Sequence, residues 1–195
     1  MKIITITLQG TTPLLMHRFN EQAEASSARG TRKIKMAETP PTPREVAEAC
    51  AYRTDKGDLY TPSTWVMGAL ISAGAERKII GSRKSMRFLL PSAVRSHSDR
   101  TRLLDPETRQ PIRDFEVDAR PVVIPATKGR VMRYRPRIEQ WLLECDVALN
   151  DEMISQTAMI EILNDAGQRY GIGDFRPEKR GPFGCFVVVG AQDHQ

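Results

Sequence analysis

Cysteine is scarce in this 195-residue chain, and its three cysteines, Cys50, Cys145 and Cys185, lie far apart in the sequence. Their number is odd and no two form a CxxC pair, which excludes a disulfide-stapled scaffold and a zinc ribbon. Histidine is equally scarce, and no HExxH or GxSxG motif occurs. No segment approaches the roughly eighteen apolar residues of a membrane span, and the opening MKIITITLQG is not a signal peptide. These absences predict a cytoplasmic protein with no membrane partner, metal or cofactor.

Positive charge is concentrated in one part of the chain. The net charge is +5, but residues 77–137 hold sixteen Lys and Arg against six Asp and Glu, a net +10, whereas the remainder carries −5. Such asymmetry is typical of a surface that binds a polyanion, for which phosphate is the usual target. The alternative is a solvated basic face that has no partner.

Hydrophobic periodicity predicts a single α+β domain. The expected elements are a strand over 2–8, a short helix from Pro43 capped by Thr42, a helix from Pro62 toward Lys78 capped by Thr61, a strand over 115–123, one bent strand or two over 130–149 with Pro136 as a bulge or an edge feature, a helix from Ser155 to Gly167 or Gly171, and a strand over 183–189. Without the short helix the order is βαββαβ, that of a ferredoxin-like or RRM-like core. In this interpretation residues 10–43 form a long mobile loop after the first strand and residues 81–114 form an insertion.

A glycine-rich segment, GIGDFRPEKRGPFG, joins the last helix to the final strand over residues 171–184. Glycine lets backbone approach a ligand closely, and Arg176, Lys179 and Arg180 place positive charge beside that backbone. The segment is neither a Walker P-loop nor a Rossmann fingerprint, because it precedes a strand. It predicts a phosphate-binding loop, and the alternative is a turn whose glycines only reverse the chain.

A second basic segment, KGRVMRYRPR, covers residues 128–137. Arginine binds phosphate bidentately and tyrosine offers a ring on which a base can stack, a combination suited to single-stranded nucleic acid. The alternative is a basic edge strand that resists aggregation. A similar cluster at the end of the second helix could also complement the helix dipole. The predicted contacts from these two clusters are Arg83, Lys84, Arg87, Lys128, Arg130, Arg133, Tyr134 and Arg135.

Residues suited to catalysis are few. Asp114, Glu116 and Asp118 are spaced by two along a strand, where they could hold Mg²⁺ or pair with neighbouring arginines. His17, next to Arg18, is the one candidate for acid–base cleavage of RNA. The sequence therefore predicts a binding protein rather than an enzyme.

Three segments resemble the RAMP superfamily, the RRM-like proteins that include the crRNA-binding backbone subunits of CRISPR effector complexes. The first strand with the following GTTPLLMH resembles the opening strand and turn of that family. YTPSTWVMGALISAG resembles the segment that opens its first core helix, and GIGDFRPEKRGPFGCFVVV resembles its glycine-rich loop and final strand. The three segments occur in the order found in the family.

The resemblance implies a non-catalytic subunit that coats a single-stranded guide RNA, polymerises along it as a helical homo-oligomer and can present it to a target nucleic acid. It places the RNA contacts at four sites, which here correspond to His17 and Arg18, Ser63 and Thr64, Lys128 to Arg135, and Arg176 to Arg180. Two alternatives stay open. One is a metal-independent RNase of the same superfamily acting through His17, and the other is a single-stranded DNA-binding or annealing protein.

Overall fold

The computed structural model describes residues 1–19, 41–123 and 129–193. Most of the expected loop, residues 20–40, and the predicted contact Lys128 lie outside the described residues. The strands are β1 (Lys2–Gly10), β2 (Leu14–Leu15), β3 (Tyr60–Pro62), β4 (Val94–Ser96), β5 (Arg100–Leu104), β6 (Glu116–Val123), β7 (Arg130–Ile138), β8 (Leu142–Leu149) and β9 (Phe186–Asp193). The helices are α2 (Pro43–Ala49), α3 (Ser63–Gly74), α4 (Leu90–Ala93) and α5 (Gln156–Arg169), with 3₁₀ turns at Met86–Phe88 and Pro177–Lys179. Within these ranges no helix has the length and apolar character needed to cross a membrane.

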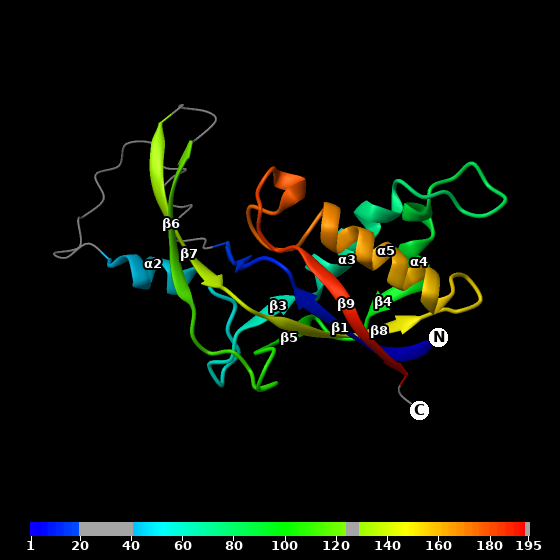
Figure 1. The fold of residues 1–195 in the computed structure, drawn as a ribbon, viewed down its shortest axis with the longest axis horizontal. Coiled ribbons are helices and arrows are strands. Elements are labelled where there is room, and N and C mark those ends of the chain that lie inside the picture. The colour runs from blue at the N-terminus through cyan, green and yellow to red at the C-terminus, as the bar shows by residue number, and fades with distance from the viewer. Residues whose placement is uncertain (20–40, 124–128, 194–195) are drawn as a thin grey trace.

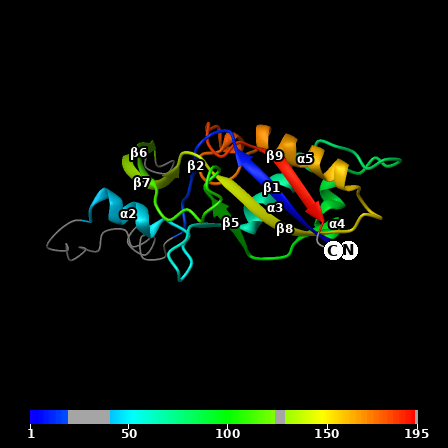
Figure 2. The same cartoon turned by 60° about the horizontal axis from the view of Figure 1, so that its bottom comes forward.

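The main sheet has the strand order β3-β5-β8-β1-β9, and β4 also pairs with β8. Neighbouring strands are antiparallel. Helices α3 and α5 cover one face of this sheet, and the other face is open (Figures 1 and 2). Strands β1, β5, β8 and β9 with these two helices follow the order βαββαβ. The α+β, ferredoxin-like prediction is therefore confirmed, and it agrees with the fold that the RAMP resemblance implies.

The core lies between this sheet and its two helices. Strand β1 alternates, so that Ile4, Ile6 and Leu8 are buried while the intervening threonines are not. The helices contribute buried residues at helical spacing, namely Val66, Ala69, Leu70 and Ala73 from α3 and Met159, Ile162, Leu163 and Ala166 from α5. Each large apolar side chain buried here stabilises the fold by roughly 1.5–3 kcal/mol. This packing holds the start of α3 and the end of α5 in fixed positions.

For two of the three predicted helices, the residue that caps the start of the helix is the one expected from the sequence. Thr42 and Glu45 form a capping box at α2, and the Ser155 side chain accepts a hydrogen bond from the third residue of α5, as predicted. The cap predicted for α3 is wrong, because Thr61 is a buried residue of β3 and Pro62 occupies the cap position. Helix α3 also ends at Gly74 rather than near Lys78, since Leu90 packs where a side chain at Gly74 would lie.

A second, three-stranded sheet has the order β2-β7-β6, and its hairpin β6–β7 extends away from the main sheet (Figure 1). The prediction of 115–123 as a core strand is therefore wrong. The second core strand is formed by β4 and β5, so residues 94–104 are not part of an insertion. Strand β5 has only five residues and buries Thr101, Leu103 and Leu104, a pattern too short and irregular to recognise in sequence.

Of the two alternatives for Pro136, the bulge is wrong, and the proline lies where β7 has no paired strand residue on the β2 side. The pairing of β6 with β7 runs without a shift from Glu116↔Arg137 to Val123↔Arg130. The proline carbonyl accepts a hydrogen bond from the Met16 N–H at 3.0 Å, just beyond the end of β2. In an antiparallel strand the backbone N and the carbonyl of one residue point toward the same neighbouring strand. The N–H that Pro136 lacks would therefore point toward Met16, which lies just beyond the end of β2.

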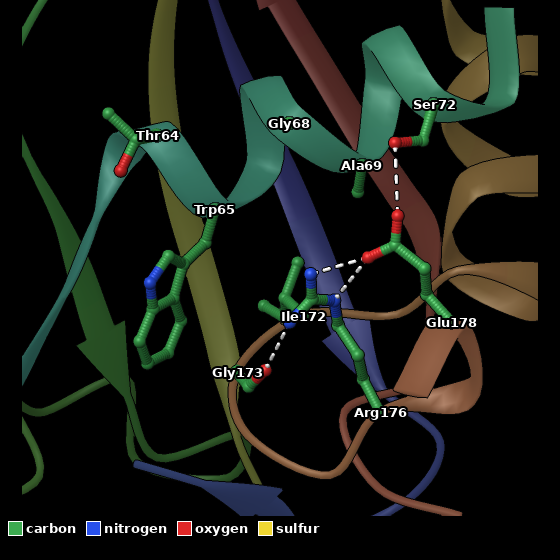
Figure 3. Close-up of a pocket in the computed structure, with 9 residues that line it drawn as sticks. All are labelled: Thr64, Trp65, Gly68, Ala69, Ser72, Ile172, Gly173, Arg176 and Glu178. Carbon is green, nitrogen blue, oxygen red and sulfur yellow. Dashed lines mark hydrogen bonds and ion pairs between the residues drawn. The ribbon is translucent and has the colours of Figure 1, made fainter. Parts of the chain in front are cut away.

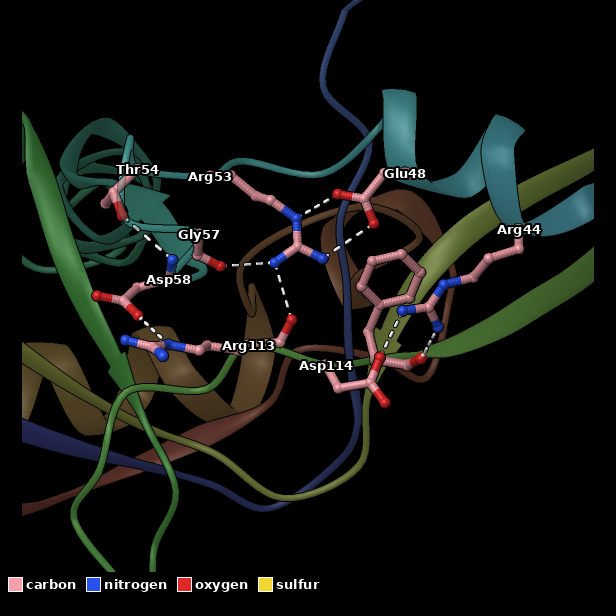
Figure 4. A network of polar contacts seen from close by, with 9 residues as sticks. Arg44, Glu48, Arg53, Thr54, Gly57, Asp58, Arg113 and Asp114 are labelled. Carbon is pink, nitrogen blue, oxygen red and sulfur yellow. Dashed lines mark hydrogen bonds and ion pairs between the residues drawn. The ribbon is translucent and has the colours of Figure 1, made fainter.

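A network of arginines fastens the base of the hairpin to α2 (Figure 4). The guanidinium of Arg53 pairs with both carboxylate oxygens of Glu48 and donates to two loop carbonyls 2.7 and 2.8 Å away. The hydrogen bond from Arg53 lowers the pKa of Glu48. Arg44 stacks 3.8 Å above the ring of Phe115, the residue that leads into β6, and pairs with Asp114. These contacts set the direction in which the hairpin leaves the main sheet.

Candidate nucleic-acid interface

The open face of the main sheet does not resemble an RRM surface. On the central strands β1 and β8, the side chains of the cross-strand pairs Thr5↔Asp146 and Thr7↔Glu144 lie on this open face. Arg102 neutralises Glu144 at 2.8 Å. In the central strands β1, β8 and β9, all of which the structure describes, no aromatic residue lies on this face, where an RRM has its stacking platform. Tyr60 lies on this face in β3, at the edge of the sheet and opposite Arg102.

The glycine-rich loop folds against the chain that follows β1. The N–H groups of Asp174 and Gly184 donate to the carbonyls of Leu15 and Pro13 at 2.9 and 2.8 Å. Gly173 has a φ of +79°, and a Cβ there would lie 2.5 Å from the Leu15 carbonyl oxygen. At these positions glycine is therefore required for the loop to fold, which supports the alternative that the sequence left open.

Gly181 provides the clearest test of a structural role for these glycines. A Cβ at this position would overlap the backbone carbonyl of Phe175. We expect Gly181→Ala to lower the thermal midpoint by several degrees, because relieving a clash with backbone costs on the order of 1–3 kcal/mol. A thermal melt measures this, with Gly190→Ala as control, since a Cβ at Gly190 would meet only the Thr7 side chain, at an ordinary contact distance of 3.6 Å. An unchanged midpoint for Gly181→Ala would contradict the packing role.

Folding of the loop brings Asp174 against the hairpin. The Arg135 side chain donates to Asp174 at 2.7 Å and lies 3.4 Å from Asp118, a carboxylate that also pairs with Arg120 at 2.6 Å. Arg135 is only 3 % exposed. The prediction that it contacts phosphate is therefore wrong in this structure, because it crosslinks the loop and the hairpin instead. Pairing of Asp114 and Asp118 with arginines also confirms the alternative to a Mg²⁺ site.

His17 lies beside this buried ion pair. Partial burial lowers the pKa of His17, and the charges of Arg133 and Arg135 lower it further, whereas Asp174 opposes them. Burial raises the pKa of Asp174, but the hydrogen bond from Arg135 and its charge outweigh burial, so that its pKa falls below the ordinary value. At neutral pH the imidazole of His17 is therefore uncharged and the carboxylate of Asp174 is ionised.

Several predicted cations remain exposed around this joint between loop and hairpin. Arg18 follows His17, and Arg133 lies on β7 close enough to influence the pKa of His17. Arg176 is different, because it pairs with Glu178 and donates to the Gly173 carbonyl at 3.0 Å. On the loop, the hairpin and the segment before α2, the predicted contacts that are exposed and have no ion pair within the described part of the chain are Arg18, Arg133, Lys179, Arg180 and, at the far end of the hairpin, Arg130.

Other predicted contacts are divided between two regions. At the start of α3 Thr64 is exposed, but Ser63 is only 7 % exposed, which contradicts its prediction as a contact. Tyr134 is partly buried against the core. Arg83, Lys84 and Arg87 are exposed in the segment between α3 and α4, at the end of the molecule away from the hairpin (Figure 1). The structure therefore does not bring this cluster together with the cations of the hairpin.

Sequence reasoning missed a group of aromatic rings. Tyr52 makes edge contacts with Tyr60 and Trp65, with ring centroids 5.7 and 5.5 Å apart. The Arg100 guanidinium lies 5.0 Å from the centre of the Tyr60 ring, and the charge of Arg18 acts on Tyr52. These residues belong to different elements and follow no period, so the sequence carries no local signal for the group.

Trp65 also forms one wall of a pocket between α3 and the glycine-rich loop (Figure 3). The pocket has a volume of about 150 Å³. Its lining consists of Thr64, Trp65, Gly68, Ala69 and Ser72 from α3 and Ile172, Gly173, Arg176 and Glu178 from the loop.

Comparisons with known proteins give a distant likeness in structure but none in sequence. No family model matches the sequence, and no curated protein matches it. Among solved structures, the crystal structure of Cmr6 from Pyrococcus furiosus is similar at 12% sequence identity and a TM-score of 0.46, and the match covers 96% of this chain and 98% of that chain. Function is therefore inferred from the residues of this chain.

Proposed function

We propose that this chain is a non-catalytic subunit that binds single-stranded RNA and coats a guide RNA as a homo-oligomer. The observation that carries the proposal is the group of exposed cations on the glycine-rich loop, on the hairpin and at Arg18, none of which has an ion pair within the residues that the structure describes. Exposed arginine and lysine bind phosphate, and release of counterions makes such binding favourable. The charge of Arg133 on the hairpin acts on His17, the neighbour of Arg18, so cations from two elements lie near this histidine.

A single strand fits this surface better than a duplex. Tyr52, Tyr60 and Trp65 lie next to Arg18, and unstacked bases bind to aromatic rings beside cationic side chains. Bases inside a duplex are not available for such contacts. The RAMP resemblance favours RNA over DNA, and the 2′-hydroxyl is the group by which a protein distinguishes the two.

The state of the purified protein tests the proposal directly. We expect protein expressed in cells to copurify with nucleic acid that RNase removes and DNase does not, visible as a fall in the 260/280 absorbance ratio. We also expect tighter binding to RNA than to DNA of equal length and sequence at the same salt concentration. Protein that purifies without nucleic acid and ignores added RNA would refute the proposal. Equal affinities would favour the single-stranded DNA-binding alternative.

Metal-independent RNA cleavage is a second candidate because of the state of His17. A neutral imidazole beside cations is the form that can accept a proton from a 2′-hydroxyl. If the protein binds RNA without cleaving it, we expect labelled RNA to stay intact when it is incubated with the protein in the presence of a chelator. Cleavage products that disappear in His17→Ala would instead support the RNase.

A further inference from the structure

We infer that the pocket between α3 and the glycine-rich loop holds one flipped-out pyrimidine base of the bound strand, with cytosine preferred over uracil. This inference rests on the proposed function, because it names the part of the single strand that the pocket recognises. It follows from the size of the pocket, from an unexplained glycine in its wall and from the polar groups at its end (Figure 3).

The size of the pocket suits a single ring. Its volume is about 150 Å³, whereas pockets for drug-sized molecules measure roughly 300–1,000 Å³. A cavity of about 150 Å³ in a protein core is known to accept benzene. A six-membered base therefore fits the enclosed part of the pocket, whereas a two-ring purine would extend out of it.

Gly68 is the glycine in the wall that packing does not explain. It lies in the middle of α3, where glycine weakens a helix relative to alanine. The other two helical glycines are explained, because a Cβ at Gly74 would overlap Leu90 and one at Gly167 would overlap the Phe186 carbonyl. A Cβ at Gly68 would meet no described atom within 4 Å. Glycine at this position keeps the wall of the pocket free of a side chain, which allows a flat ligand to lie close to the helix backbone.

The α3 side of the pocket also offers an aromatic surface. The Trp65 indole, three residues before Gly68 on the same helix, lines the pocket, and Tyr52 supports it through an edge contact between rings whose planes are 88° apart. Ala69 and Ile172 complete the apolar lining. Nucleobases stack on indole rings with little dependence on sequence, so this wall explains binding of a base but not the choice among bases.

The polar end of the pocket selects for hydrogen-bond donors. Glu178 is held by Arg176 and by the Ser72 hydroxyl, whose oxygen lies 3.4 Å from its carboxylate. Arg176 and Glu178 neutralise each other, so neither charge is available to attract or repel a phosphate. The Glu178 oxygen that accepts only the long hydrogen bond from Ser72 can accept another, and the exocyclic amine of cytosine is the donor that acidic side chains recognise. The base, rather than the sugar–phosphate backbone, is therefore the part of the strand that fits.

Filling the pocket tests the inference without damaging the fold. Gly68→Leu introduces a better helix former into open space, so we expect the thermal midpoint to rise by roughly 2–4 °C. Binding of an oligocytidine RNA, measured by fluorescence anisotropy with the full chain, should weaken by an order of magnitude because the stacked base is lost. Gln168→Leu, at an exposed position of α5, is the matched control and should leave affinity unchanged.

Tryptophan fluorescence reports on the pocket itself. The chain has two tryptophans, and Trp141 is fully buried with its N–H bonded to the Thr12 carbonyl at 2.9 Å. Stacking of a base should therefore quench Trp65 alone, and the quenching should disappear in Trp65→Phe and in Gly68→Leu. Free cytidine at millimolar concentration should quench more strongly than uridine, and adenosine least.

The outcomes separate this inference from the proposed function. If Gly68→Leu binds RNA as tightly as the wild type does, and cytidine does not quench the fluorescence, the base-binding pocket is refuted. The proposed function is then unaffected. Saturable quenching by cytidine that Gly68→Leu abolishes, in a protein that does not bind RNA, would support the pocket and refute the proposed function. Equal quenching by all nucleosides would overturn the assignment to pyrimidines.

Discussion

Arg135→Met is expected to lower the free energy of unfolding by about 3–5 kcal/mol, the usual cost of removing one partner from a buried ion pair. Asp118 and Asp174 would then face each other across the joint between the hairpin and the loop without the guanidinium that separates them. Methionine matches the length of the arginine stem, so loss of packing contributes little. Chemical denaturation measures the change, and Arg133→Met is the control because Arg133 is exposed and carries the same charge.

The loss of stability in Arg135→Met should depend on pH, and the direction of that dependence can be predicted. The pKa of Asp174 is lowered in the folded protein, so the stability gained from ionised Asp174 is present above its unfolded pKa, about 3.9, and is lost as pH falls through the lower folded value. The difference between wild type and Arg135→Met should therefore be largest at neutral pH and shrink in acid. In the variant the pKa of His17 should rise, because a cation that lowers it is removed. Equal stability at pH 7, or a His17 pKa that NMR shows unchanged, would refute the crosslink.

Replacing Arg130, Arg133, Lys179 and Arg180 together with glutamine is expected to weaken RNA binding on the order of 100-fold at about 0.15 M salt. Each phosphate contact that is lost lowers the slope of log K against log salt by roughly 0.7 for a single strand, so four contacts lower it by about 3. All four side chains are exposed, so the fold should be retained. Anisotropy titrations across a salt series measure both quantities.

A variant with the same change in net charge serves as the control. Lys78, Arg83, Lys84 and Arg87 are also exposed, and they lie in the segment between α3 and α4, at the end of the molecule away from the hairpin (Figure 1). If RNA binds at the joint between the glycine-rich loop and the hairpin, glutamine at these positions should change the slope little. Equal losses in both variants would mean that overall charge, not this surface, controls binding.

Local signals in the sequence were sufficient to predict several elements. The alternation of Ile4, Ile6 and Leu8 predicted β1, and the caps at Thr42 and Ser155 predicted α2 and α5, because both signals depend on neighbouring residues. The second core strand was missed for the opposite reason. Strands β4 and β5 are short, and their burial depends on pairing with residues of β8 that are 38 to 55 positions later in the chain.

The sequence predicted where the positive charge of the candidate site lies, but not which of its cations are exposed and which are buried in ion pairs. Arg133 and Arg135 are equivalent in sequence, yet one is exposed and the other is buried by a carboxylate 39 residues away. Likewise, Arg176 is neutralised by Glu178, while Lys179 and Arg180 remain free in the described structure. Composition therefore identified the basic region, whereas the choice between contact and crosslink needed tertiary structure.

The position of β1 in the main sheet has a consequence for biosynthesis. Both of its neighbours, β8 and β9, come from the last third of the residues described. At roughly 5–20 residues per second, a nascent chain carries β1 without either partner for on the order of ten seconds. Its apolar face, Ile4, Ile6 and Leu8, is accessible during that interval. We therefore expect early engagement by holdase chaperones on the ribosome, and we expect truncations that end before residue 142 to aggregate rather than to fold.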